Sequence, residues 1–444
     1  MTRHRLRRLV PEASPACLAL LDPARGPVEA PIRSEVFGIQ RFRQHAGSLA
    51  CAQQARVVAS ADPAFFPRLH ENVLVLRETD RYLASAARVG YHVTPAAAWL
   101  LDNFHLIDAQ LKEIHDQSPA SYFRHLPVLV EAHLAGLPRI YGIAWAFVAH
   151  NDSAFDADLL AAVLASYQEH RELTLGELWA LPTTLRVILI ENLRRLAERV
   201  AANAAARELA NGVSDRIERY TPADLDALLA WMDCRGVRRA FLLQVSQRLQ
   251  DAAAPEDSPW HAWAGEAFAD IAAERLEQQA EQASYNLSVS NVVTSLRTIG
   301  DARWRNIVSD ASALVSLLET SPAFCAEDSA TQDESLHAVE RLARRCAQGE
   351  PAVARVVLDA MRASPSVLDP EATPGYWLMG DGRRRVELRL GLRRGLSAAS
   401  RDRVRRWLLA AYLGMLAVGG IGLVAWTLSA DTALRPDWWL LAAV

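Results

Sequence analysis

Two groups of polar residues in this chain have types and spacings that could support chemistry. The first contains Asp102 and His105, which lie three residues apart in a segment with helical periodicity and would share one face of that helix. Such a pair could bind a metal or transfer a proton. Asp108 and His115 follow on the same segment, but the sequence has no HExxH pattern and no clear third ligand. The spacing therefore favours a buried polar contact between helices.

The second group is the Asp-x-Asp pair formed by Asp156 and Asp158. Sugar-nucleotide transferases hold a divalent cation with such a pair, because hard oxygen ligands suit that ion. Here the pair opens a helical segment, where carboxylates are stabilised by free backbone N–H groups and by the helix dipole. The sequence favours helix capping over metal binding, and it contains no glycine-rich phosphate loop.

The remaining candidate groups are interpreted as structural. Glu177 and Glu191 are single carboxylates on one long helical segment. Five aromatic residues that could line a sugar site are more typical of a hydrophobic core. They are Phe123, Tyr141, Trp145, Phe147 and Trp179. The sequence therefore predicts no catalytic, cofactor-binding or metal-binding residue. We expect the helices that carry Trp99 and Tyr141 to pack together as the centre of the body, with Asp102 or His105 satisfied by a neighbouring helix.

Hydrophobic residues at helical spacing predict the elements that hold these groups. The predicted helices cover residues 67–89, 95–117, 136–150, 155–171, 174–209, 221–250 as two helices, 260–298, 331–348 and 351–363. Two more helices are predicted, one capped by Ser34 and one capped by Asp301. Thr174 and Glu177 form a capping box, and Pro182 is expected to kink or restart the helix that follows.

Only residues 375–382 are compatible with a short strand and turn, through their Asp-Gly pair. No other stretch alternates with period two for long. The predicted fold class is therefore all-α, with a multi-helix cytoplasmic body followed by one transmembrane helix and the start of a second.

The membrane prediction depends on residues 407–428, which carry no charge. A helix of that length rises about 33 Å, close to the thickness of a bilayer's hydrocarbon core. Four basic residues precede it: Arg401, Arg403, Arg405 and Arg406. Because positive flanks stay in the cytoplasm, the body is predicted to be cytoplasmic and anchored in the lipid bilayer. Residues 437–444 are apolar again and are interpreted as a second, truncated span, so the chain is expected to continue.

The composition fits a packed cytoplasmic body. The chain has 444 residues, of which 51% are hydrophobic, and its net charge of −4 predicts no nucleic-acid partner. Its five cysteines form no CxxC pair, which indicates a reducing compartment. The expected divisions are an irregular lead-in (1–33), a helical domain (34–250), a second helical portion (260–364), a linker with the basic juxtamembrane segment (365–406), and the two spans.

A series of segments along the chain carries a recognisable pattern: residues 101–107, 137–153, 173–186, 191–196, 291–297, 304–305, 337–344 and 375–382. In this order, these segments resemble the N-terminal region of cyclic β-1,2-glucan synthases. One departure lies at residues 327–336, where an aromatic residue and two arginines of the family pattern are absent.

The resemblance implies a very large bacterial inner-membrane enzyme that uses UDP-glucose and a divalent metal to build a periplasmic cyclic glucan. It implies that this chain is the N-terminal, membrane-anchored segment that supports a downstream transferase domain. The transferase Gln-x-x-Arg-Trp pattern is missing, because Arg405-Arg-Trp407 lacks the glutamine.

Two alternatives stay open at this level. The chain could be a stand-alone helical scaffold or regulatory membrane protein that binds a separate synthase. It could also be a helical-barrel glycosidase, which would need two carboxylates about 5–10 Å apart in an open cleft.

Overall fold

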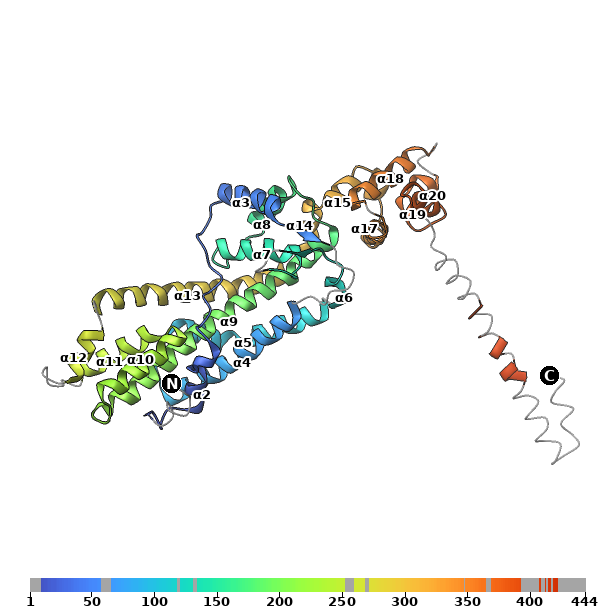
Figure 1. Cartoon of the computed structure of the whole chain (residues 1–444). Coiled ribbons are helices and arrows are strands. Elements are labelled where there is room, and N and C mark those ends of the chain that lie inside the picture. Colours follow the sequence, from blue (N-terminus) through green and yellow to red (C-terminus); the bar gives the residue numbers. More distant parts are fainter. Residues whose placement is uncertain are drawn as a thin grey trace, which may run out of the picture. The chain divides into compact units, whose positions relative to one another are not determined.

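The computed structural model is all-α, as predicted, apart from one short pair of strands (Figure 1). It describes residues 9–56, 65–117, 120–130, 134–251, 259–267, 271–346, 348–364 and 369–392, together with 407–408, 412, 414–416 and 418–421. The chain forms two compact units, Met1–Leu317 and Leu318–Val444. The first unit thus includes the predicted helical domain and most of the predicted second helical portion.

The first unit contains a long series of helices. They are α2 (Pro15–Leu20), α3 (Ile39–Ala52), α4 (Phe65–Val89), α5 (Pro95–Gln117), α6 (Ala120–Phe123), α7 (Arg139–His150), α8 (Ala157–Gln168), α9 (Leu175–Ser214), α10 (Pro222–Arg235), α11 (Arg238–Asp251), α12 (Pro259–Ala267), α13 (Ile271–Asp301), α14 (Trp304–Ala311) and α15 (Ala313–Leu318). Short 3₁₀ turns lie at Pro23–Arg25 and Ile217–Arg219. The strands β1 (Ala55–Arg56) and β2 (Val128–Leu129) pair antiparallel, with Ala55 opposite Leu129.

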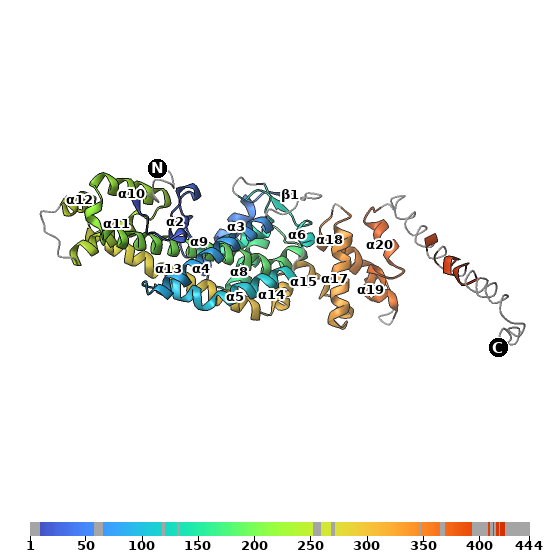
Figure 2. The ribbon, with the colours of Figure 1, turned by 90° about the horizontal axis from the view of Figure 1, so that it is seen from below.

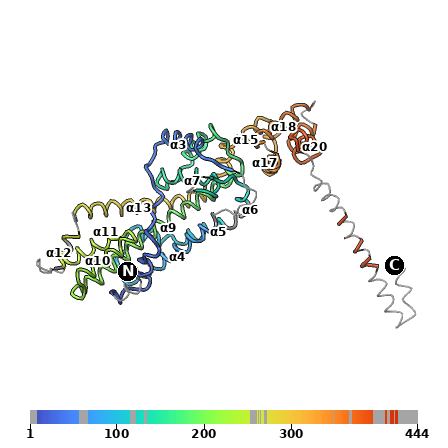
Figure 3. Tube along the Cα trace, viewed as in Figure 1, coloured from blue at the N-terminus to red at the C-terminus, as the bar shows by residue number. Residues whose placement is uncertain are grey.

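The centre of the first unit is α9, which packs against α2, α4, α5, α7, α11 and α13. Figures 1 and 3 show it running along the unit with α13 on one side and α4 and α5 on the other. Of its 40 residues, 30 are buried, so neighbouring elements cover most of its surface. The predicted centre, direct packing of α5 on α7, is wrong, because α7 packs chiefly on α9 while α5 packs on α13 and α9.

Local signals place the start of α9 where the sequence predicts it. The Thr174 side chain accepts from the Glu177 backbone N–H at 3.2 Å, and the Glu177 carboxylate accepts from the Thr174 N–H at 3.0 Å. The expected restart at Pro182 is wrong, because α9 continues through it. Neighbours cover this stretch on every side, which compensates for the one backbone hydrogen bond that proline removes.

Two predicted caps are wrong because tertiary contacts use those residues differently. The helix expected at Ser34 begins at Ile39, with Gly38 as its N-cap. Ser34 instead lies in an extended segment and donates its backbone N–H to the carbonyl of Ala149 at 2.8 Å. Asp301 is the last residue of α13 and not a cap, since Arg303 precedes α14.

The lead-in is also more ordered than predicted. Within residues 9–33, the short helix α2 is capped by Ser14 and buries Cys17, Leu18 and Leu20. It packs on α9 where that helix is rich in alanine, and the Cys17 thiol reaches the Ala205 carbonyl at 3.4 Å. Small side chains on α9 allow this close approach. Figure 2 shows α2 beside α10, at the same end of the unit as α11 and α12.

The second unit, within its described residues, is a small helical cluster. Its helices are α16 (Pro322–Cys325), α17 (Ser329–Ala343), α18 (Glu350–Arg362), α19 (Pro374–Leu378) and α20 (Arg383–Arg389), with a 3₁₀ turn at Pro370–Ala372. The divergent stretch 327–336 contains the start of α17, where Asp328 accepts hydrogen bonds from the backbone of Ala330 and Thr331. The strand suggested at 375–382 is wrong: this stretch is α19 followed by a turn.

Close packing explains the glycine at the end of that turn. A Cβ atom at Gly382 would lie 2.7 Å from the rings of both Trp377 and Tyr376. We therefore expect Gly382→Ala to reduce the free energy of unfolding by about 1–3 kcal/mol, through overpacking. Urea denaturation of the chain, with hydrogen exchange of residues 374–389 as a local readout, measures this effect. Gly375→Ala is the matched control, since its nearest neighbouring atom is 3.9 Å away. Equal stability of the two variants would contradict the packing argument.

The predicted membrane span lies mostly outside the described residues. Its described positions, between 407 and 421, are helical, and their large apolar side chains, such as Trp407 and Ile421, are exposed. Among all described residues, no helix is long and apolar enough to cross a bilayer. Arg401, Arg403, Arg405 and Arg406, the rest of the predicted span and residues 437–444 lie outside the described residues.

Candidate functional site

Charged side chains are concentrated around the middle of α9. Glu191 is fully buried and is held by three groups from three helices. Arg68 on α4 donates two hydrogen bonds to its carboxylate, at 2.8 and 2.5 Å. Arg195, one turn further along α9, approaches to 2.7 Å, and the Tyr141 hydroxyl of α7 donates at 2.9 Å. The carboxylate therefore joins α4, α7 and α9 at one point.

The contacts continue from Glu191 as a chain of alternating charge. Arg195 also lies 3.1 Å from Glu29, Glu29 lies 2.7 Å from Arg194, and Arg194 lies 3.1 Å from Glu198. Glu198 finally pairs with Arg235 of α10 at 2.8 Å. We call this set, from Arg68 to Arg235, the Glu191 network. Its four arginines and three glutamates give a net charge of +1 (four minus three), so nearly all the charge is neutralised within it.

The pKa values show that the Glu191 network stabilises its charged forms. Burial alone would lower the pKa of Arg68, but the hydrogen bond and charge of Glu191 outweigh it and raise that pKa. Burial alone would raise the pKa of Glu29, but Arg194, with its hydrogen bond and charge, lowers it overall. Burial and the Glu191 charge raise the pKa of the Tyr141 hydroxyl, which stays protonated and donating. The arrangement suits fixed positioning of helices and not proton transfer near neutral pH.

A second buried pair fixes α7 to the start of α9. Arg139 donates to Glu177 at 2.7 and 2.5 Å and also to the Glu172 carbonyl at 3.0 Å. The same Glu177 carboxylate completes the capping box with Thr174. Both predicted carboxylates of α9, Glu177 and Glu191, thus take structural positions, as the sequence indicates.

The loop after α7 brings together segments that are distant in sequence. Asp152 and Ser153 have positive φ angles of 51° and 66°, which are unfavourable for residues with a side chain. Ser288 of α13 donates to Asp152 at 2.6 Å, and Asn192 of α9 donates to Ser153 at 2.8 Å. Asn291, also on α13, donates to the Asp152 carbonyl at 3.0 Å. These bonds hold the strained loop in place between α9 and α13.

The structure does not bring the four candidate residues of the sequence analysis together as one site. They are Asp102, His105, Asp156 and Asp158. Asp156 caps α8, accepting from the Leu159 backbone N–H at 2.9 Å, and Asp158 lies in the first turn. The predicted helix-capping role is therefore confirmed. Asp102 and His105 are exposed on α5, so their expected burial between helices is wrong. Asn103 is the buried polar residue there, and it accepts from Arg297 of α13 at 2.5 Å.

The described residues do not fit the divalent metal that the family implies. They contain no group of three or more His, Cys, Asp or Glu side chains placed to hold an ion. At the Asp-x-Asp pair, the Asp156 carboxylate is engaged by the helix terminus. We therefore derive no metal-dependent step for this chain.

Two histidines meet beside α3. The rings of His45 and His150 lie 4.9 Å apart, and Phe37 stacks on His150 at 3.8 Å. Burial lowers the pKa of His45, and the charge of His150 lowers it further. Arg41 adds a second positive charge, 4.7 Å from the Phe37 ring centre.

This pair predicts a loss of stability in mild acid. Because folded His45 binds its proton at a lower pH than unfolded His45, the unfolded state binds more protons below about pH 6.5. The contribution of neutral His45 to the free energy of unfolding should therefore be fully present above that pH. It should be lost as the pH falls below it. Thermal melts at several pH values should show a steeper decrease for the parent than for His45→Gln. Parallel decreases, or a normal His45 titration by NMR, would contradict this prediction.

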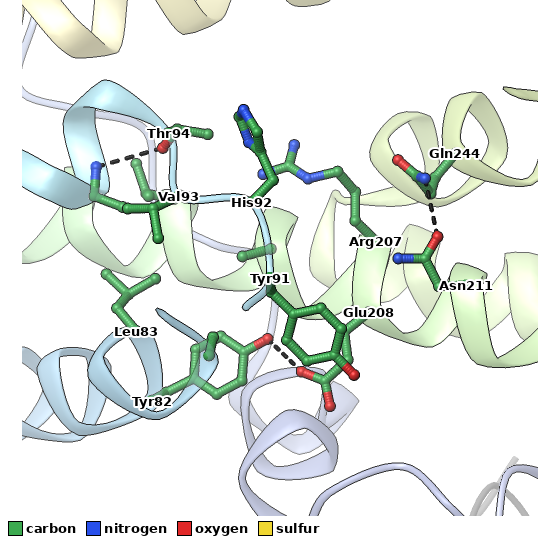
Figure 4. Close-up of a pocket in the computed structure, with 14 residues that line it drawn as sticks. Tyr82, Leu83, Tyr91, His92, Val93, Thr94, Arg207, Glu208, Asn211 and Gln244 are labelled. Carbon is green, nitrogen blue, oxygen red and sulfur yellow. Dashed lines mark hydrogen bonds between the residues drawn. The ribbon is translucent and has the colours of Figure 1, made fainter. Parts of the chain in front are cut away.

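A cavity that the sequence analysis did not predict lies beside α9. The cavity has a volume of about 100 Å³ and is lined by residues of α4, α5, α9, α11 and the 91–94 loop. In Figure 4, the Tyr82 hydroxyl donates to Glu208, at 2.8 Å, while the Arg207 guanidinium lies on the other side, near His92. Gln244 donates to Asn211 at 2.9 Å. The only sequence signal was an isolated Arg-Glu pair within an alanine-rich stretch.

Comparison with known proteins identifies the family. No protein-family model matches the chain. The sequence is 32% identical to cyclic beta-(1,2)-glucan synthase NdvB of Rhizobium meliloti (strain 1021) over an alignment 375 residues long that covers 81% of this chain. The matched stretch spans only 13% of that relative's length. The ordered family-like segments and this long match agree, and the chain belongs to the cyclic β-1,2-glucan synthase family.

Proposed function

We propose that the chain is a helical support module of a membrane-bound cyclic β-1,2-glucan synthase and does not itself catalyse glucosyl transfer. The observation that carries the proposal is the Glu191 network. Its charged side chains bind one another and join α4, α7, α9 and α10, so they position helices, and its two buried carboxylates, Glu191 and Glu198, are both paired with arginines. The similarity to cyclic beta-(1,2)-glucan synthase NdvB supports glucan synthesis as the activity of the whole protein.

The substrates and partners follow from this role. UDP-glucose and a divalent metal would bind to a transferase domain elsewhere in the synthase, and this module would contact that domain. The uncharged stretch 407–428 supports an anchor in the bacterial inner membrane, and the preceding arginines support a cytoplasmic body. The net charge of −4 argues against a nucleic-acid partner.

The catalytic part of the proposal is tested in the complete synthase with Asp156→Ala combined with Asp158→Ala. These are the carboxylates most similar to a transferase motif, and we expect glucan synthesis from UDP-glucose to continue at the parent rate. Losing the cap should cost only about 0.5–2 kcal/mol of stability. Abolished synthesis by a variant that melts like the parent would show that the pair is catalytic.

The orientation is tested with a reporter that is active only in the periplasm. We expect no activity when it is fused after residue 400 and activity when it is fused after residue 432. The reverse pattern would place the helical body outside the cytoplasm and refute that part of the proposal.

A further inference from the structure

The cavity of Figure 4 is the inner end of a longer groove. A second depression, of about 690 Å³, continues from it between α11 and the start of α13. Both are lined by His92, Thr94, Arg207 and Gln244, so the two are continuous. Asn286 of α13 accepts the backbone N–H of Ala96 at 2.9 Å, which fixes the 91–94 loop beside α13 at the mouth of the groove.

The outer part of the groove is lined mainly by side-chain amides. Six glutamines from α11 and α13 face it: Gln244, Gln247, Gln250, Gln278, Gln279 and Gln282. An amide group both donates and accepts hydrogen bonds, as a hydroxyl group does. A surface with many amides therefore matches a ligand that carries many hydroxyl groups.

Arg207 supplies further donors where the two parts of the groove join. Its guanidinium is half-buried, and within the described residues it makes no hydrogen bond or ion pair. Burial lowers its pKa, which indicates a desolvated cation without a full set of partners. The neighbouring Glu208 does not neutralise it, because Glu208 accepts from Tyr82 on the opposite side of the cavity. A ligand with oxygen acceptors would satisfy the guanidinium.

The lining disfavours two other classes of ligand. The charged residues of the outer part are Arg207, Arg275 and Asp251, too few cations for a polyanion. Its aliphatic residues are Ala240 and the buried Leu243, so it offers no exposed apolar anchor for a protein partner. At the inner end, Tyr91 is 41% exposed and presents an aromatic ring beside the polar groups.

We propose that this groove binds a neutral oligosaccharide, whose hydroxyl groups are recognised by the glutamine amides and by Arg207. The class of ligand follows from the lining alone. The choice of a β-1,2-glucan as the first probe rests on the proposed function. In that setting, the groove would hold glucan on the helical body, apart from the site of glucosyl transfer.

The test is calorimetric titration of cyclic β-1,2-glucan into the full chain, purified in detergent. We expect Arg207→Gln and Gln244→Ala each to raise Kd by about tenfold or more, which corresponds to the loss of a good polar contact. Gln247→Ala, on the exposed side of α11, should also weaken binding and carries little risk to folding. Gln40→Ala, an exposed glutamine of α3 far from the groove in sequence, is the matched control and should bind like the parent.

Three results would overturn the proposal. The first is that the folded parent chain binds no glucan. The second is that all three groove variants bind glucan with unchanged affinity. The third is that inorganic phosphate binds at Arg207 while glucan does not. Binding of a cyclodextrin at the same groove would support an oligosaccharide site that tolerates other linkages. The proposed function is tested separately by the reporter fusions and the double aspartate variant, so its failure would leave these binding results intact.

Discussion

Replacing Glu191 by alanine should reduce the free energy of unfolding by about 3–5 kcal/mol, because removal of one partner leaves buried charges without compensation. Glu191 is fully buried, and its removal deprives Arg68 of its carboxylate partner and leaves Arg195, whose side chain is only 15% exposed, with its longer ion pair to Glu29. The Tyr141 hydroxyl would lose its acceptor as well. Urea denaturation followed by circular dichroism measures the change. Glu191→Gln should cost less, because the amide keeps part of the hydrogen bonding.

The matched control is Asp108→Ala, which removes an ion pair of similar length at the surface. Asp108 lies 3.1 Å from Arg77, and both side chains are about half exposed. Exposed pairs typically contribute about 0–1 kcal/mol, so this variant should unfold almost like the parent. If Glu191→Ala and Asp108→Ala have equal stability, the Glu191 network does not hold the first unit together.

Arg235→Ala should have a comparable effect, about 3–5 kcal/mol, and a more local consequence. The Arg235 side chain is fully buried and donates to the carbonyls of Leu20 and Gly26 as well as to Glu198. It therefore attaches the N-terminal segment to α10 and the Glu191 network. Its loss would leave two carbonyls and a carboxylate without their donor.

Hydrogen exchange measured by mass spectrometry separates this effect from general destabilisation. Amides of residues 15–28 should exchange faster in Arg235→Ala than in Glu191→Ala, when the two are compared at equal global stability. Arg238→Ala is the control, since the Arg238 side chain is about half exposed and its ion pair within the described residues is with the exposed Asp233. Unchanged protection of residues 15–28 in Arg235→Ala would mean that apolar burial of α2, and not Arg235, holds the segment.

The family was recognisable from sequence because its segments occur in order along the chain. The structure shows that three of these segments contact one another. The loop of Asp152 and Ser153, the residue Asn192 and the residue Asn291 belong to three separate segments, yet they bond to one another. By contrast, Asp102 and His105 have a spacing compatible with metal binding or proton transfer, but they do not form a site. Spacing places two residues on one face of a helix, but only packing decides whether that face is covered.

Local sequence signals were sufficient to predict the features that depend on neighbours within a turn or two. The bounds of α5, the capping box at Thr174, the cap at Asp156 and the burial of α7 all follow from local caps and hydrophobic spacing. By contrast, the pairing of the charged residues and the position of the groove depend on tertiary packing. Glu29 and Arg194 are 165 residues apart, and the groove joins Arg207 to glutamines of two other helices. Such contacts depend on how whole helices pack around α9, and no local pattern encodes them.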